Sequence, residues 1–399
     1  MQSGSKSLLS GKIHGSDMYE KINGEINSSA VHVVDLRSDT ISKPTPEMRE
    51  AMANAVVGDD VFGEDPTVAE LERRSAELLG KEDALFVCSG TMANLIAIMV
   101  HCSHRGSEII SGDNGHTFRF EQGGPAQIAG VQTSLLKNND DGTFNLDELR
   151  DSIRKNPDCH EPYTSLVILE NTHNMCGGKV LPLDWIEKVR NLTKEYNLPV
   201  HMDGARVMNA AVYLKVPVER VVRDVDTVCF CLSKGLGAPI GSVLAGSKAF
   251  IDKSRRMRKV LGGGWRQAGV IAAAGLVALD KMIDRLQVDH DHIMQIAKGI
   301  DEMKSKTFRV DLPTVQSNIL MMYLDVSRIT AKEVQHRLAS VLETDEIKVS
   351  VKASSRDQGF VRFVAYWKIT KEDVEAAVKK IQFVIKEFDT KFNNEVKNV

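Results

Sequence analysis

The sequence has few aromatic residues, 6% of its 399 positions, and no strong excess of either charge. Its 51 basic and 54 acidic side chains leave a formal net charge of −3. A balanced chain of this kind lacks the basic surface that attracts nucleic acid or an anionic membrane. We therefore expect neither a nucleic-acid partner nor a membrane partner.

Cysteine is scarce as well, with six residues in the whole chain. This is too few for a disulfide scaffold, so we expect reduced thiols. No apolar run approaches the roughly 18 residues that a bilayer-spanning helix needs. Residues 1–32 contain serine, glycine and several acids but no apolar signal core. We interpret them as a disordered tail of a cytoplasmic protein, with organelle import as the less favoured alternative.

Hydrophobic residues make up 42% of the chain, which is enough for a packed core. The length exceeds that of a usual single core, so we expect a large and a small domain. Apolar strand-like runs alternate with helical patterns over residues 33–275, which predicts an α/β domain with a mostly parallel sheet. Residues 276–399 are typical of a smaller α+β domain.

Several helix ends can be assigned from the sequence. Thr45 precedes Pro46, which is favoured at the first position of a helix. A second helix should end at Gly80, because glycine readily adopts the left-handed conformation at a helix end. In the C-terminal part, Thr330 and Glu333 have the spacing of a capping box.

Residues 226–246 contain the most informative segment, an apolar strand followed by Lys234 and a glycine-rich loop. A lysine beside buried strands is either solvated or desolvated enough to act as a neutral amine. Desolvation favours the neutral form, which attacks carbonyl carbons. This segment alone supports both readings equally.

A second strand end is rich in small residues. The apolar run at residues 84–88 is followed by Ser89, Gly90 and Thr91, and a helical pattern begins there. The free N–H groups of a helix start can hold phosphate. An ordinary strand-to-helix turn is the alternative.

Two more strand ends carry groups of catalytic type. His116 follows a strand and a glycine-rich turn, and Asp203 closes a strand three residues before Arg206. Asp203 and Arg206 could form an ion pair or could hold a heteroaromatic ring between them. Because the carboxyl ends of parallel strands share one edge of a sheet, these groups should lie near Lys234. A phosphate cradle, a carboxylate, an imidazole and a lysine are what pyridoxal phosphate requires.

The resemblance to a known family rests on seven motifs that run in order along the chain. They are DLRSDT (35–40), GDDVFGEDPT (58–67), SGTM (89–92), ENTHN (170–174), DGAR (203–206), SKGL (233–236) and GGGWRQ (262–267). In these motifs the chain closely resembles the low-specificity L-threonine aldolases. The resemblance implies the aspartate aminotransferase fold (fold type I of pyridoxal phosphate enzymes), with a seven-stranded sheet.

The resemblance also implies roles for individual residues in binding pyridoxal 5'-phosphate. Lys234 would form the Schiff base, Asp203 would pair with the pyridine nitrogen and His116 would stack on the ring. The phosphate would be held by a cradle and by a neighbouring subunit. The cradle would consist of Ser89, Gly90 and Thr91, and the neighbouring subunit would contribute Arg266. Arg206 would also contact the cofactor.

The substrate contacts follow from the same resemblance. Ser38, Arg206 and Arg362 would hold the substrate carboxylate, and His160 would approach its hydroxyl group from across a subunit interface. The chain departs from the family pattern at Phe62, where tyrosine is frequent. It departs again at residues 363–366, where a Val-Thr-His ending is frequent, and Arg362 as an outward surface residue is the alternative reading.

These observations predict a lyase that cleaves L-threonine or L-allo-threonine to glycine and acetaldehyde. His116 and His160 are the candidate bases, with a phosphate-held water as a third possibility. The assembly implied by the resemblance is a homotetramer with active sites shared across a dimer interface, and we expect no metal. Other reactions of the same cofactor, β-elimination or racemisation, are the enzymatic alternatives. A catalytically silent scaffold of the same fold is the non-enzymatic one.

Overall fold

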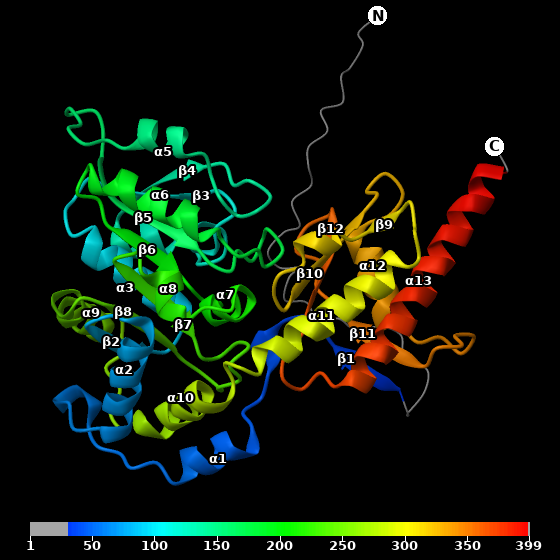
Figure 1. Cartoon of the computed structure of the whole chain (residues 1–399), viewed down its shortest axis with the longest axis horizontal. Coiled ribbons are helices and arrows are strands. Elements are labelled where there is room, and N and C mark those ends of the chain that lie inside the picture. Colours follow the sequence, from blue (N-terminus) through cyan, green and yellow to red (C-terminus); the bar gives the residue numbers. More distant parts are fainter. Residues whose placement is uncertain (1–30, 398–399) are drawn as a thin grey trace, which may run out of the picture.

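The computed structural model describes residues 31–397, arranged as two lobes (Figure 1). The larger lobe is built on a seven-stranded sheet. In spatial order its strands are β2 (Asp83–Val87), β8 (Ser242–Gly246), β7 (Thr227–Cys231), β6 (Val200–Asp203), β5 (Tyr163–Glu170), β3 (Ser107–Gly112) and β4 (Gln132–Leu136). Strand β8 runs antiparallel to both of its neighbours, and all the other pairs are parallel. The prediction of an α/β fold with a mostly parallel sheet is confirmed.

Helices cover both faces of this sheet. They are α1 (Pro46–Ala53), α2 (Pro66–Leu79), α3 (Gly90–His101), α4 (His116–Arg119), α5 (Leu146–Ser152), α6 (Leu183–Lys194), α7 (Val207–Leu214), α8 (Val218–Val222), α9 (Lys248–Val260) and α10 (Gly269–Lys281). Alternate residues of β2 point to opposite faces, as the strand period requires. Leu85 and Val87 join the core formed with α3 and α9, whereas Ala84 and Phe86 join the core formed with α2 and α10.

The helix ends follow the predicted capping chemistry. The Thr45 hydroxyl accepts a hydrogen bond from Met48 N, and α1 begins at Pro46. Helix α2 ends at Gly80, which has φ of +62°. The predicted capping box, formed by Thr330 and Glu333, is also present. Each of these sequence predictions is confirmed.

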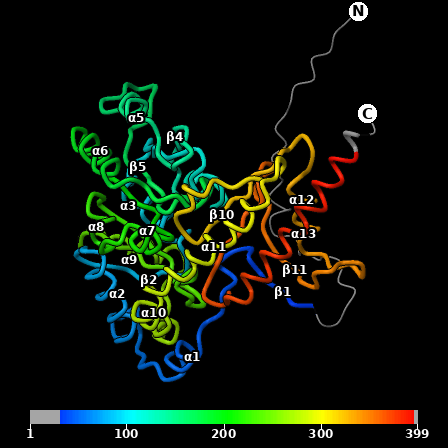
Figure 2. The backbone as a smooth tube through the Cα atoms, turned by 45° about the vertical axis from the view of Figure 1, so that its right-hand side comes forward, coloured from blue at the N-terminus to red at the C-terminus, as the bar shows by residue number. Residues whose placement is uncertain are grey.

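The smaller lobe contains α11 (Leu286–Asp301), β9 (Phe308–Arg309), β10 (Ile319–Leu324), α12 (Ala331–Ala339), β11 (Val349–Lys352), β12 (Phe360–Val364) and α13 (Lys371–Lys397). Strands β12, β10 and β9 form an antiparallel sheet. Strand β1 (His32–Asp35), at the start of the described residues, lies in this lobe and pairs in parallel with β11 (Figures 1 and 2). Val34 and Leu36 are accordingly part of the second core.

The domain division at residue 275 and the tail over residues 1–32 stay predictions, and nearly all of the tail lies outside the described residues. All six cysteines are free thiols. Among the helices of residues 31–397, none is long and apolar enough to cross a bilayer.

Candidate active site

The loop that carries Lys234 bends sharply after β7. Gly237 and Gly241 have φ values of +78° and +112°, which side chains rarely adopt. A Cβ atom at Gly241 would lie 2.4 Å from the Phe86 ring. The bend leaves the Lys234 side chain half-buried near two buried carboxylates, and its positive charge lowers the pKa of both Asp39 and Asp203. The lysine therefore faces the site rather than open solvent.

Asp203 ends β6 in a buried position, with 2% of its surface exposed. Its Oδ2 accepts a hydrogen bond of 2.9 Å from Asn94 Nδ2, and its Oδ1 accepts one of 3.1 Å from Ala205 N. Burial works to raise the pKa of Asp203, but the nearby His116 and Lys234 side chains and the hydrogen bonds from Asn94 and Ala205 outweigh it, and the pKa lies below its usual value. The Cys229 thiol also donates to Oδ1 at 3.9 Å, and the four acceptor positions of a carboxylate still leave one for a further donor.

The predicted phosphate cradle forms the start of α3. Ser89 caps the helix, and its hydroxyl accepts a hydrogen bond from Met92 N. A Cβ atom at position 90 would lie 2.9 Å from Cys231 Sγ, so glycine lets the cradle approach the end of β7. The cradle and the Lys234 loop are therefore adjacent, and Thr91 is exposed beside them.

His116 begins α4 close to Asp203. Its Nδ1 lies 2.9 Å from Glu121 Oε1, and its backbone N–H donates to Glu170 Oε2 at 2.6 Å. The ligand-type atoms of His116, Glu121 and Asp203 all lie within 4.8 Å of one another. The imidazole is 28% exposed, so one side of it remains open.

Arg206 pairs with Asp39 and not with Asp203. Its Nε and Nη2 donate to the two carboxylate oxygens of Asp39 at 2.8 and 2.7 Å, and both side chains are buried. Burial alone would raise the pKa of Asp39, but the charge and hydrogen bonds of Arg206 bring it to about 2. The ion pair between Asp203 and Arg206 that the sequence left open is wrong.

Arg362 is also buried, with 1% of its surface exposed. Its Nη1 donates to Asn174 Oδ1 at 2.5 Å, and its Nη2 donates to the carbonyl oxygen of Arg37 at 3.1 Å. The outward surface position considered as an alternative is wrong. Ser38 is 8% exposed. In the sequence it stands between Arg37, which Arg362 contacts, and Asp39, which Arg206 contacts.

Two predicted site residues lie on the surface, each paired with a neighbouring acid. The side chain of His160 is 82% exposed and that of Arg266 is 54% exposed. His160 Nδ1 lies 3.2 Å from Asp158, and Arg266 Nη1 donates to Asp59 at 3.0 Å. Neither is brought to Lys234 within one chain by the contacts described for it.

The sequence analysis did not find three residues of this site. Asp39, Asn94 and Glu121 are 0%, 1% and 5% exposed and contact Arg206, Asp203 and His116 respectively. Asp39 lies within one of the seven motifs. Glu121 could have been suspected only from its position, as an acid five residues after His116. Nothing in the sequence around Asn94 indicates a role in the site.

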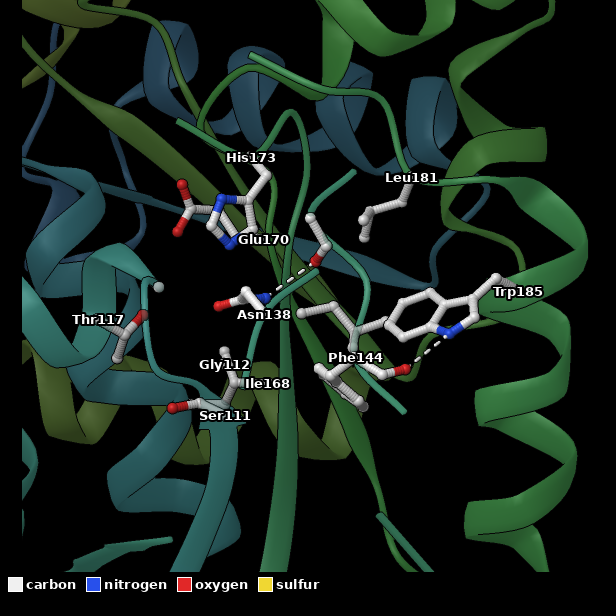
Figure 3. A pocket seen from close by; sticks show the side chains of 13 residues that line it. Ser111, Gly112, Thr117, Asn138, Phe144, Ile168, Glu170, His173, Leu181 and Trp185 are labelled. Carbon is white, nitrogen blue, oxygen red and sulfur yellow. Dashed lines mark hydrogen bonds between the residues drawn. The ribbon is translucent and has the colours of Figure 1, made fainter. Parts of the chain in front are cut away.

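A small cavity lies next to the residues that flank His116 (Figure 3). It has a volume of about 20 Å³, enough for one water molecule. Glu170, His173 and Asn138 are among its lining residues, and Asn138 Nδ2 donates to Gly142 O at 3.0 Å. Gly115 and Thr117 also line this cavity, and Glu170 accepts the backbone N–H of His116 between them.

The residues fit pyridoxal phosphate. The close contact at position 90 allows a phosphate cradle next to Lys234, and the buried Asp203 carboxylate has room for a pyridinium N–H. The fold and this set of groups define the class as a pyridoxal phosphate enzyme of fold type I. The chain belongs to the low-specificity L-threonine aldolase family, and the family model that matches it, that of the beta-eliminating lyases, covers residues 35–326.

Three individual proteins illustrate the similarity. Low-specificity L-threonine aldolase 1 of Arabidopsis thaliana is 46% identical over 351 residues, covering 88% of this chain and 95% of the relative. Alanine racemase TOXG of Cochliobolus carbonum is 32% identical over 295 residues, covering 73% and 75%. The structure of Leishmania major threonine aldolase superposes with a TM-score of 0.72 at 20% identity, covering 88% of this chain and 99% of that one.

Replacing Arg362 should weaken substrate binding. We expect Arg362→Ala to raise KM roughly 10- to 100-fold, because a charge-assisted hydrogen-bonded pair contributes about 1.5–3 kcal/mol. Arg362→Gln keeps a donor for Asn174 and should show a similar KM with less loss of thermal stability. Steady-state kinetics and thermal unfolding separate the two effects, and an unchanged KM in both variants would remove Arg362 from the substrate site.

Asp289 on α11 makes stability depend on pH. Burial raises its pKa to about 7, against the opposing effect of the Arg285 pair. The folded protein therefore holds a proton that the unfolded chain has lost, and wild-type stability falls as pH rises from about 4 to 7. Asp289→Asn does not titrate, so its stability relative to wild type should rise by roughly 2 kcal/mol between pH 5 and pH 7. Urea unfolding at both pH values measures this, and a difference independent of pH would contradict it.

Proposed function

We propose that the chain cleaves L-threonine or L-allo-threonine to glycine and acetaldehyde with pyridoxal phosphate as cofactor. The observation that carries this proposal is the convergence of Lys234, Asp203 and His116 with two buried arginines at one sheet edge. The proposal is also supported by the 46% identity of this chain to a protein named low-specificity L-threonine aldolase 1.

When bound, the cofactor supplies an electron sink that accepts the bonding pair of the Cα–Cβ bond. In our proposal Lys234 holds the cofactor covalently, and the Asp203 carboxylate holds the proton on its ring nitrogen. The start of α3 would hold the phosphate through the N–H groups of Gly90 and Thr91. Burial of Asp203 keeps water from competing for that proton.

The substrate is held by its carboxylate. Arg206 and Arg362 provide planar donors suited to a carboxylate, and Ser38 lies between the residues that they contact. The β-hydroxyl proton must leave as the Cα–Cβ bond breaks, and one proton must return to Cα to complete glycine. His116 and His160 are the candidate groups for the first transfer.

The first test is a visible absorption spectrum of the purified protein before and after addition of L-allo-threonine, with acetaldehyde assayed in the same sample. A yellow protein whose band changes while acetaldehyde appears supports the proposal. A protein that stays colourless with added pyridoxal phosphate contradicts it.

A second candidate is racemisation, which the similarity to a protein named alanine racemase favours. It uses the same cofactor-binding groups but breaks a Cα–H bond instead of Cα–Cβ. A yellow protein that releases no acetaldehyde, yet exchanges the α-hydrogen of alanine with deuterium from solvent, would support this reaction over aldehyde release.

We also infer a cytoplasmic homotetramer with sites shared between subunits. The exposure of His160 and Arg266 supports sharing, because the contacts described for them within one chain do not bring either to Lys234. Phe62 and Val260, which are 75% and 72% exposed, would be covered in such an assembly. Six free thiols suit a reducing compartment. Light scattering and cell fractionation test the assembly and the compartment.

Complementation tests the shared site directly. His160→Ala and Lys234→Ala should each be nearly inactive, and co-expression of the two should restore about a quarter of wild-type activity, because half of randomly paired dimers carry one intact site of two. Activity that stays at the level of the two inactive single variants would place His160 in the same site as the Lys234 of its own chain.

A further inference from the structure

Glu121 is a buried acid that the proposed chemistry does not yet use. Its side chain is 2% exposed. Two nitrogen atoms lie at hydrogen-bond distance from the same oxygen, Oε1: His116 Nδ1 at 2.9 Å and Asn94 Nδ2 at 2.9 Å. Burial raises the pKa of Glu121, with the charge of Asp203 acting in the same direction and the hydrogen bonds from His116 and Asn94 against it. A buried acid is costly, so its placement here calls for a physical reason.

The contacts determine the form of the imidazole. An amide nitrogen can only donate, so Oε1 of Glu121 is already an acceptor for Asn94. With Glu121 ionised, the same oxygen can only accept from His116 as well, so the hydrogen of a neutral ring lies on Nδ1. The lone pair is then on Nε2, which has no hydrogen-bond partner among the described residues.

The orientation of Asn94 is fixed independently. Its Oδ1 lies 3.1 Å from His201 Nε2 and accepts from the Cys229 thiol at 3.2 Å. Its Nδ2 also donates to Asp203 Oδ2 at 2.9 Å. The Asn94 amide thus connects the carboxylate of Glu121 to the carboxylate of Asp203.

Within residues 31–397, Glu121 is the one acceptor at hydrogen-bond distance from His116 Nδ1. Glu170, on β5, accepts the backbone N–H of His116 and the backbone N–H of Asn174. Asp203 and Lys234 act on the site through their charges, and the Phe120 ring lies 5.6 Å from the imidazole. The orientation of the His116 ring therefore depends on Glu121.

We propose that Glu121 is a positioning residue, which holds His116 with Nδ1–H toward itself and Nε2 available to the substrate, and which is linked to Asp203 through Asn94. The role rests on the proposed function, since the pair would orient the imidazole over the cofactor. It predicts that the proton acceptor at His116 is Nε2.

The test compares holoenzymes of wild type, Glu121→Leu, Glu121→Gln and Glu108→Gln. Glu108 is an equally buried acid on β3, paired with Arg154 away from the site, and serves as the matched control. We expect Glu121→Leu to lower kcat about 10- to 100-fold, with KM within about twofold, because proton transfer needs an oriented base. Glu121→Gln should recover most of kcat, since its amide oxygen accepts the same hydrogen.

Visible circular dichroism of the bound cofactor gives a readout that does not require turnover. The band should change in Glu121→Leu, because the ring beside the cofactor is no longer held, and should match wild type in Glu121→Gln and Glu108→Gln. A Glu121→Leu variant with wild-type dichroism and kcat would overturn the proposal.

A measurement on unmutated Glu121 keeps the proposal testable if the leucine variant does not fold. Solid-state ¹⁵N spectra of histidine-labelled protein, assigned with His116→Gln, should show a protonated Nδ1 in His116. The Nε2–H form would overturn the proposal. The dichroism and the ¹⁵N spectra do not depend on acetaldehyde release. If wild type binds the cofactor but releases no acetaldehyde, the proposed function fails, and these two measurements still test the role of Glu121.

Discussion

Lys234→Ala is expected to reduce kcat by at least about 10⁴-fold, because the covalent attachment of the cofactor and the amine that it requires are both lost. The fold should persist, since no residue described in the structure accepts a hydrogen bond from the Lys234 side chain and removing it leaves neighbouring partners satisfied. Steady-state acetaldehyde release and thermal unfolding provide the two measurements.

Lys248→Ala is the matched control for this experiment. Lys248 lies on the surface at the start of α9, with 70% of its side chain exposed, and should be replaceable without effect. Borohydride reduction adds a second readout, because it should fix the cofactor to a peptide containing Lys234 in wild type and in Lys248→Ala. Substantial turnover by Lys234→Ala would refute the assigned role.

Asp203→Asn is expected to lower kcat about 10²- to 10³-fold with a much smaller change in KM, because a neutral amide cannot hold the ring-nitrogen proton as a buried carboxylate does. The substitution keeps the volume of the side chain. It also keeps an oxygen that accepts the N–H of Ala205 or of Asn94. The fall in kcat should therefore come from the changed chemistry of the site and not from unfolding.

Asp226→Asn is the control that separates a loss of kcat from a loss of stability. Asp226 pairs with Arg190 and accepts the backbone N–H of Val200, at the opposite end of the strand that carries Asp203. It should lower thermal stability without a selective fall in kcat. Equal effects of the two substitutions on kcat and stability would show that Asp203 contributes only to the fold.

Much of the fold could be predicted because the signals are local. A hydroxyl before Pro46, a glycine at position 80 and the Thr330–Glu333 pair each act within one turn of helix. The alternation of apolar strands and helices predicted the sheet in the same way. The pairing of β1 with β11 has no such signal, since its two strands are more than 300 residues apart.

The same distinction holds for the site. Lys234, Asp203 and His116 each follow a strand, and the parallel sheet brings strand ends together, so their meeting was predictable. The partner of Arg206 was not: Asp39 lies 167 residues away, whereas the nearest acid in the sequence is Asp203. Side-chain direction, not spacing along the chain, decides between them.

By itself, the sequence determined the helix ends, the mostly parallel sheet and the residues that meet at its edge, because these depend on local backbone preference and strand order. Only the tertiary structure decided that Arg362 is buried, that Arg206 pairs with Asp39, and that Glu121 and Asn94 connect His116 to Asp203. Such contacts join side chains from separate elements, and their distances are set by how those elements pack.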